Sequence, residues 1–285
     1  MHLLAIPYPA IDPVALQLGP LSIKWYGLAY VAGLLLGWTY VKRLLADKRL
    51  WPQGKAPFDA ATVDDLFLWV ALGVILGGRI GNALLYDGAY YLRHPLEIFM
   101  IWKGGMAFHG GMLGTILAMW LFARSHGVPA PQVMDLVSAA VPIGLLFGRL
   151  ANFINAEVIG RPSTVPWAMV MPGAGPEPRH PSQLYEAALE GLVLFILLAF
   201  AIRSGALARR GRVFGLFLIG YSLARIALEG FRQADAQFVT DDNPHGFVLH
   251  LGAAGLTMGQ LLSLPMLLAG LILVVRSARG ARVPA

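Results

Sequence analysis

Polar and charged residues interrupt a long apolar run in the middle of the sequence. The run begins near Leu136, and its last part contains Arg149, Asn152, Asn155 and Glu157. An arginine in a membrane helix costs about 2.5–3.5 kcal/mol on insertion scales, and such residues usually face a cavity or a partner. A guanidinium binds a phosphate through a planar fork of donors, while amides can orient a headgroup and Glu157 can balance an arginine. The run therefore indicates phosphate recognition, or a structural ion pair between Arg149 and an acid on a neighbouring helix.

Helical periodicity divides this stretch into two faces. At about 100° per residue, small and polar residues share one face and apolar residues take the other. The polar face contains Gly148, Arg149, Asn152, Asn155 and Ala156, and the lipid-compatible face contains Leu150, Ala151 and Ile154.

A second polar group follows the spacing of a helix. Tyr221, Arg225 and Glu229 are four residues apart and lie on one helical face. Arg225 is a second candidate for binding a phosphate. The structural alternative is an internal Arg225–Glu229 pair that neutralises a buried charge.

One histidine and one tyrosine complete the candidate residues. His109 is followed by two glycines, which leave room for a ligand, and an imidazole accepts a proton near neutral pH. An interfacial position is the alternative for His109. Tyr26 follows Trp25, and both rings are expected at a membrane interface. Arg79 is also intramembrane, and we favour a structural role for it.

The composition is that of a multi-spanning membrane protein. The chain has 285 residues, 57% of them hydrophobic and only 13% charged, with a mean hydropathy of +0.63. Nothing suggests nucleic acid. Cysteine is absent, so any thiol chemistry must use a thiol of the substrate. The other histidines lack metal-ligand spacing, and we expect no metal and no cofactor.

Seven apolar runs are long enough to span a membrane, within a single polytopic domain of residues 1–285. They are Ile23–Val41, Leu66–Tyr86, Phe108–Ala123 (short unless Ile98–Trp102 contributes), Leu136–Ile154, Leu184–Ile202, Val213–Phe231 and Gly259–Val275. We read the first as a retained helix, because no signal-peptide pattern precedes it. The fold class is an all-α integral membrane protein.

Lysine and arginine are distributed unevenly between the two sets of connecting segments. One set holds Lys42, Arg43, Lys48, Arg49, Lys55, Arg124, Arg203, Arg209, Arg210, Arg212, Arg276, Arg279 and Arg282, and the other holds Lys24, Arg93, Lys103, Arg161, Arg179 and Arg232. The positive-inside rule then predicts a periplasmic N-terminus and a cytoplasmic C-terminus. Residues 87–107, 156–182 and 232–258 become periplasmic. Prolines exclude regular helix from residues 160–181, Ser182 is a candidate N-cap for the next helix, and the 232–258 segment is a candidate lid or arm.

This orientation brings the candidate residues to one side of the membrane. Arg79, Arg149 and Arg225 lie near the outer ends of their helices, and Tyr26 and His109 at the outer starts of theirs. All lie within roughly 10 Å of the outer hydrocarbon boundary, so we expect a site that opens to the outer leaflet. Small residues at four-residue spacing, such as Gly73, Gly77 and Gly81 or Gly110 and Gly114, are interpreted as helix packing positions. Asp135, near the start of the fourth helix, is interpreted as structural.

The pattern Gly-Arg-x-x-Asn-Phe-x-Asn-x-Glu-x-x-Gly from Gly148 to Gly160 resembles the signature of the prolipoprotein diacylglyceryl transferases, bacterial inner-membrane enzymes. The similarity extends from Lys24-Trp25-Tyr26-Gly27 to Tyr221–Glu229. One departure is Ala151, where the family often has glycine.

The resemblance implies transfer of the sn-1,2-diacylglyceryl group from phosphatidylglycerol to the lipobox cysteine of signal-peptide-bearing prolipoproteins. The products are a thioether and glycerol 1-phosphate, and the surrounding partners are membrane lipids. By this resemblance His109, Arg149 and Arg225 are catalytic, and the substrate-binding residues are Arg149, Tyr26, Asn152, Asn155, Glu157, Gly160, Tyr221 and Glu229. A lipid or solute transporter is one alternative, although it predicts polar residues that continue to the cytoplasmic helix ends. A metal-dependent headgroup transferase is another, although it needs closely spaced intramembrane aspartates.

Overall fold

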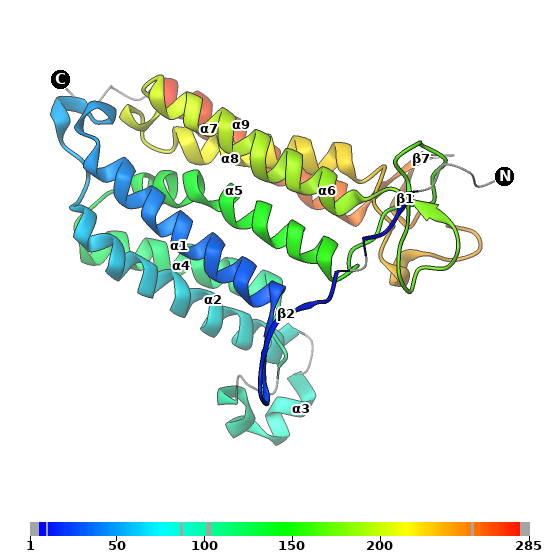
Figure 1. Ribbon diagram of the computed structural model, residues 1–285. Helices are drawn as coiled ribbons and strands as arrows, with labels where there is room; N and C mark the ends of the chain where they lie inside the picture. Colours follow the sequence, from blue (N-terminus) through cyan, green and yellow to red (C-terminus); the bar gives the residue numbers. More distant parts are fainter. Residues whose placement is uncertain (1–5, 10, 86–87, 101–103, 252–253, 280–285) are drawn as a thin grey trace.

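Long helices dominate the computed structural model, which describes all residues except 1–5, 10, 86–87, 101–103, 252–253 and 280–285. Each of the seven predicted apolar runs forms a long helical stretch within the described residues (Figure 1). These stretches are α1 (Trp25–Ala46), α2 (Val63–Leu85), α4 (Phe108–Ser125), α5 (Ala130–Ile154), the continuous α6 (Ser182–Glu186), η6 (Ala187–Val193) and α7 (Leu194–Arg203), α8 (Arg212–Leu228) and α9 (Met258–Arg279). The short helices are α3 (Gly88–Arg93), η1 (Lys48–Leu50), η2 (Pro52–Gly54), η3 (Ala60–Thr62), η4 (Pro95–Phe99), η7 (Ala206–Ala208) and η8 (Ala236–Phe238).

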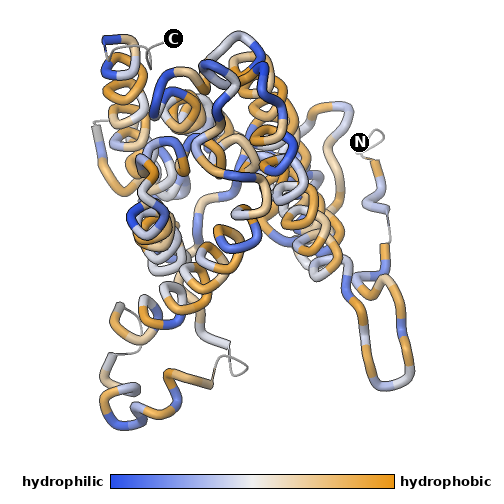
Figure 2. Tube along the Cα trace, turned by 90° about the vertical axis from the view of Figure 1, so that its left-hand side faces the viewer, coloured by the Kyte–Doolittle hydropathy of each residue, from blue (hydrophilic) through white to orange (hydrophobic). Residues whose placement is uncertain are grey.

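Apolar residues follow most of the length of these helices (Figure 2). In the described part of the chain, four helical stretches are long and apolar enough to cross a membrane: Ala60–Leu84, Ala130–Ile154, Ser182–Arg203 and Met258–Arg279. Many large apolar side chains on α1, α2 and α7 are exposed, as expected for surfaces that contact lipid. The fold is therefore that of a mostly helical membrane protein.

Several predicted boundaries differ from the observed ones. The first helix starts at Trp25 rather than Ile23, because Leu21–Lys24 form strand β3 and pair with β2 (Val14–Leu18) in an antiparallel hairpin. Helix α5 starts at Ala130, well before the predicted Leu136, and Pro129 occupies its N-cap position. The predicted positions that lie outside the described residues are Tyr86, Ile101, Trp102, Lys103 and Arg282.

The prediction of an all-α fold missed three small sheets. One contains β1 (Ile6–Pro7), β4 (Met169–Val170) and β5 (Pro178–Arg179), the second is the β2–β3 hairpin, and the third pairs β6 (Phe247–Leu251) with β7 (Ala254–Thr257). The hairpin β2–β3 and helix α3 both project from the same end of the helix bundle (Figure 1). As predicted, the proline-rich segment 160–181 contains no helix; it carries β4 and β5 instead.

Glycines allow close contact in several helix pairs, and two of these pairs bear on the site. Helix α2 packs mainly on α4, and a Cβ added at Gly73 would lie 2.6 Å from the carbonyl oxygen of Gly114. Helix α1 packs mainly on α5, where a Cβ added at Gly33 would lie 3.2 Å from the Cα of Gly144. This close approach confirms the packing role predicted for the small residues. Because α1 packs mainly on α5 and α2 mainly on α4, space remains between α1 and α2.

Asp135 links α5 to the start of α8. Its carboxylate accepts hydrogen bonds from the backbone N–H groups of Gly211 (2.7 Å) and Phe214 (2.8 Å). Gly211 has φ +79°, a left-handed conformation that favours glycine. The structural role predicted for Asp135 is thus confirmed: its carboxylate caps the start of α8.

Candidate active site

Two buried glutamates on one helical stretch hold the arginine of the signature. Glu186 ends α6 and Glu190 lies one turn later in η6, a π-helical segment, and both side chains are 0% exposed. From α5, Nη1 of Arg149 lies 2.8 Å from Oε2 of Glu186, and Nη2 lies 3.1 Å from Oε2 of Glu190. Wide π-helical turns inside an α-helix often occur at functional sites. Here Glu190 lies within the π-helical segment and Glu186 directly precedes it.

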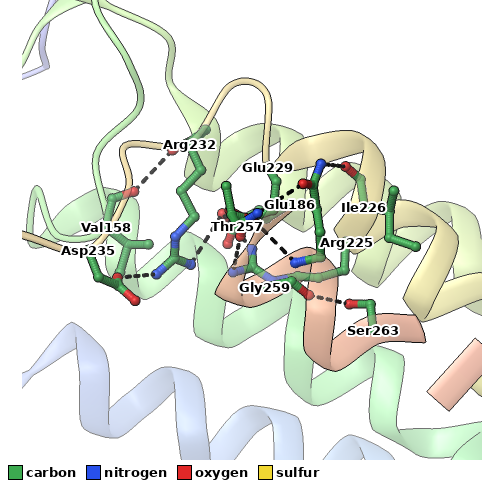
Figure 3. Close-up of polar contacts among 12 residues, drawn as sticks. Val158, Glu186, Arg225, Ile226, Glu229, Arg232, Asp235, Thr257, Gly259 and Ser263 are labelled. Carbon is green, nitrogen blue, oxygen red and sulfur yellow. Dashed lines mark hydrogen bonds and ion pairs between the residues drawn. The ribbon is translucent and has the colours of Figure 1, made fainter. Parts of the chain in front are cut away.

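Glu186 also lies close to two further arginines. Its Oε1 lies 3.9 Å from Nη1 of Arg225 on α8 and 3.8 Å from Nη1 of Arg232, which follows that helix. Arg225 makes a shorter ion pair of 2.5 Å with Glu229, and the hydroxyl of Thr257 donates to the other oxygen of Glu229 at 2.9 Å. Figure 3 shows this cluster, with Arg225 and Arg232 directed at Glu186. Three guanidinium groups from three parts of the chain therefore meet around one carboxylate.

The cluster is close to charge balance. Arg149, Arg225 and Arg232 oppose the carboxylates of Glu186, Glu190 and Glu229, and each arginine side chain is only 14–19% exposed. Buried charges persist in proteins when they are paired, because an unpaired ion loses its hydration without compensation. The carboxylates thus fix the positions of the guanidinium groups in a region of low dielectric. A guanidinium has five donors, so each arginine can hold its carboxylate and still present donors to an anion.

An apolar cavity of about 650 Å³ opens beside Arg149. It lies between α1, α2 and α5, and Tyr26, Arg149 and Asn152 line one end of it. Most of the remaining lining consists of valine, leucine, glycine and alanine. A charged group at one end and an apolar groove beyond it fit a molecule with an anionic head and hydrocarbon chains.

The end of α5 departs from the predicted two-faced helix. The helix stops at Ile154, so Asn155, Ala156 and Glu157 follow in a turn in which Ala156 has φ +52°. The prediction of a common face is therefore wrong for Asn155 and Ala156. It is also wrong for Ala151, which we expected to face lipid but which is 0% exposed. Helical periodicity cannot place residues beyond the helix end.

Asn152 and Glu157 nevertheless contact each other across this turn. The side-chain amide of Asn152 donates to Oε2 of Glu157 at 3.2 Å. At the same end of the cavity, the hydroxyl groups of Tyr26 and Tyr30 lie 3.5 Å apart. The signature residues Arg149 and Asn152 thus line the same end of the cavity as Tyr26 of the first helix.

Gly160 lies at a crowded crossing of backbone segments. It pairs with Arg232, its carbonyl accepts a hydrogen bond from Arg179 at 3.2 Å, and an added Cβ would lie 2.9 Å from the carbonyl oxygen of Phe231. Close backbone approach explains the glycine, which holds the signature loop against the segment that carries Arg232. Tyr221 stacks on Phe217, one turn before Arg225.

His109 lies apart from this cluster. It is in the first turn of α4, its side chain is exposed, and it is not among the described residues that line the cavity. Helix α4 packs on α2, so His109 belongs to the other pair of helices. The structure therefore brings Arg149, Arg225, Glu229, Asn152, Glu157 and Tyr26 to one region, whereas His109 is on a helix whose described residues do not line the cavity.

Arg79 has a network of its own. Its side chain is 3% exposed and donates hydrogen bonds to the backbone carbonyl groups of Glu97, Ile98, Met100, Gly104 and Gly105. These contacts hold residues 97–100 and 104–105 against α2, in agreement with the structural role favoured for this arginine.

Sequence reasoning missed three members of the cluster: Glu186, Glu190 and Arg232. Acids inside the apolar run Leu184–Ile202 are a signal that would have identified both Glu186 and Glu190. Ser182 was predicted to cap this helix, but it is the first helical residue and its hydroxyl donates to the carbonyl of Val158 at 3.0 Å. No group of three or more metal-binding side chains is found in the described part of the chain.

The fold and the site together define a class: a helical membrane protein with an arginine–carboxylate cluster at the end of an apolar cavity. A model of the prolipoprotein diacylglyceryl transferase family matches residues 13–276. Similar proteins carry the name phosphatidylglycerol–prolipoprotein diacylglyceryl transferase. Those of Nitrobacter hamburgensis and Rhodospirillum rubrum are each 54% identical to this chain and cover 99% of it, with 94% and 98% of their own lengths aligned. That of Rhizobium meliloti is 51% identical over 98% of this chain and 97% of its own. The chain belongs to the prolipoprotein diacylglyceryl transferase family.

Proposed function

We propose that this chain transfers the sn-1,2-diacylglyceryl group of phosphatidylglycerol to the lipobox cysteine of prolipoproteins. The observation that carries the proposal is the convergence of Arg149, Arg225 and Arg232 on Glu186, with Arg149 at the end of an apolar cavity. Relatives at 51–54% identity carry the name of this activity. These relatives and the family give no support to the transporter alternative.

The reaction joins the cysteine sulfur to a glycerol carbon. As sulfur attacks, the bond between that carbon and the phosphate oxygen breaks, and its electron pair goes to the oxygen of the departing glycerol 1-phosphate. The leaving group gains negative charge, so guanidinium groups already fixed in position lower the barrier. Arg149 and Arg225 are the arginines that we propose to hold the phosphate. Glu186 and Glu190 position them without contacting the substrate.

The thiol proton needs an acceptor, and we propose His109 for this step. A cysteine thiol with an ordinary pKa of about 8.5 is only a few per cent ionised at neutral pH. A base that takes the thiol proton while the sulfur attacks therefore accelerates the reaction. An exposed imidazole at the first turn of α4, beside two glycines, is accessible to a peptide that arrives from outside. Because His109 does not line the cavity, the peptide thiol would meet the lipid between the α2–α4 pair and α5.

The remaining signature residues receive supporting roles. Tyr26 and Asn152, which line the cavity beside Arg149, would bind the headgroup. Asn155, Glu157 and Gly160 would shape the loop over it, and Tyr221 on α8 and Glu229, which directly follows that helix, would orient Arg225.

The membrane arrangement forms part of the proposal. We propose seven spans in a bacterial inner membrane, with α1, α4 and α8 crossing in addition to the four most apolar stretches. The N-terminus would be periplasmic, the C-terminus cytoplasmic and the site on the periplasmic side. The excess of lysine and arginine in the segments between α1 and α2 and between α7 and α8 supports this orientation.

The experiment is complementation of a bacterium depleted of its own diacylglyceryl transferase. The chain should restore growth and the modification of a reporter lipoprotein, whereas Arg149→Ala should restore neither. Arg124→Ala is the matched control. It makes the same change at an exposed arginine in the last turn of α4, which is not among the residues that line the cavity. Normal growth with Arg149→Ala, at a protein level equal to that of the control, would remove this arginine from the proposal.

A further inference from the structure

One stripe of α5 follows the apolar cavity along its length. Val137, Val141, Gly144 and Gly148 all line the cavity and are spaced four, three and four residues apart, as residues on one helical face are. From the level of Arg149 to that of Val137 the helix axis advances about 18 Å at 1.5 Å per residue. The stripe therefore connects the arginine cluster to the deep end of the groove.

The residues that form this wall change from glycine to valine with increasing distance from Arg149. A Cβ added at Gly144 or Gly148 would meet no atom within 4 Å, so bare backbone forms the wall near Arg149. Farther in, the valine side chains of positions 141 and 137 project from the same face. The α5 wall of the groove is thus bare backbone near the charged end and carries valine side chains farther in.

Polar contacts fix the deep end of the groove. Trp38 lines the cavity there, together with Val41 and Val63, which are buried. The indole N–H of Trp38 donates to Asp64 at 2.7 Å, and Nζ of Lys42 lies 4.1 Å from the centre of its ring. An indole held from two sides cannot turn aside easily, so the deep end is a fixed floor.

The length of the groove matches hydrocarbon chains of one leaflet. The hydrocarbon core of a bilayer is about 30 Å thick, so the chains of one leaflet reach about 15 Å. Measured from Arg149 along α5, Val141 lies about 12 Å deep and Val137 about 18 Å deep. With a phosphate at Arg149, chains of ordinary length would end at these two valines.

We propose that the stripe of Val137, Val141 and Gly144 sets the upper limit of acyl-chain length in the lipid substrate. This inference rests on the proposed function and assigns the occupant of the groove as the acyl chains of a diacyl phospholipid. A bulky side chain at any one of these positions should lower the maximum acyl-chain length that the protein accepts. This maximum should be lowest for a substitution at Gly144, higher at Val141 and highest at Val137.

The test is a competition between lipids in one reaction. Purified wild-type protein and the variants Gly144→Phe, Val141→Phe and Val137→Phe each receive a lipobox peptide and an equal mixture of dilauroyl, dimyristoyl, dipalmitoyl and distearoyl phosphatidylglycerol. Mass spectrometry of the peptide resolves the products by chain length. Val141→Phe should lower the ratio of distearoyl to dilauroyl product about tenfold or more, because the excluded methylenes lose their apolar contacts. Gly144→Phe should lower this ratio further, and Val137→Phe should lower it least.

The ratio is measured within each sample, so it does not depend on how much variant protein is folded. Leu197→Phe is the control, because Leu197 on α7 is 58% exposed and outside the cavity; its ratio should equal that of the wild type. Equal ratios in all variants, or limits that do not follow depth, would overturn the inference. If Gly144→Phe does not insert, the order of Val141→Phe and Val137→Phe decides. A wild-type protein that modifies the peptide with none of the lipids would contradict the proposed function itself.

Discussion

Removing Arg149 should damage stability and activity through separate contacts. Its guanidinium pairs with Glu186 at 2.8 Å and with Glu190 at 3.1 Å, and both carboxylates are fully buried. In Arg149→Ala these carboxylates lose their nearest positive charge. Breaking a buried ion pair by removing one partner costs about 3–5 kcal/mol.

The loss of activity has a different magnitude and cause. A hydrogen bond to a charged group contributes about 1.5–3 kcal/mol, so two bonds from one guanidinium to a phosphate contribute about 3–6 kcal/mol. At about 1.4 kcal/mol per factor of ten, Arg149→Ala should lower kcat/KM by about 10²–10⁴-fold. Glu190→Gln keeps the Arg149–Glu186 pair and should cost much less activity.

A double variant separates the two effects. Arg149→Ala combined with Glu190→Gln removes one cation and one anion, so it should regain part of the thermal stability in detergent that Arg149→Ala loses. It should regain none of the transfer activity, because the phosphate still lacks its guanidinium. The reasoning would be refuted by an unchanged melting temperature in Arg149→Ala, or by a double variant that transfers as fast as Glu190→Gln alone.

Three further predictions concern orientation, the base and metal ions. Single cysteines at the exposed positions Thr240 and Ser204 should differ in intact cells: an impermeant thiol reagent should label the first and not the second, and the reverse pattern would invert the proposed topology. His109→Gln should lose nearly all transfer at neutral pH and regain part of it toward pH 9, because the substrate thiol then ionises without help. Lost lipid binding in this variant, with no gain at high pH, would instead assign His109 to headgroup orientation. A chelator should leave transfer unchanged; inhibition that a divalent ion reverses would refute the metal-free mechanism.

The contacts that the sequence predicts well are local. The apolar runs are long enough to identify the helices, and the four-residue spacing of Arg225 and Glu229 predicts the 2.5 Å pair that forms between them. The glycine spacing likewise indicated close helix contacts, which α2 and α4 make. Each of these features depends on residues within one or two helical turns.

Contacts between distant segments could not be predicted in this way. The structural alternative given for Arg149, an ion pair with an acid on a neighbouring helix, does form, and its partners are Glu186 and Glu190. The sequence could not name these partners, because nothing within α5 or the α6–η6 stretch specifies that pairing. The partners of Arg79 are backbone carbonyl groups, which every residue possesses and which carry no sequence signal. Strands β1, β4 and β5 were missed for a related reason: they have two residues each, too few to show an alternating pattern.

The most direct test of the central claim is the reaction of the purified protein with phosphatidylglycerol and a lipobox peptide, with both products counted. The account predicts one diacylglyceryl group on the cysteine sulfur for every glycerol 1-phosphate released, and no product when the peptide cysteine is replaced by serine. Release of free fatty acid or of diacylglycerol without peptide modification, or an unmodified peptide under conditions in which the protein is folded, would contradict it.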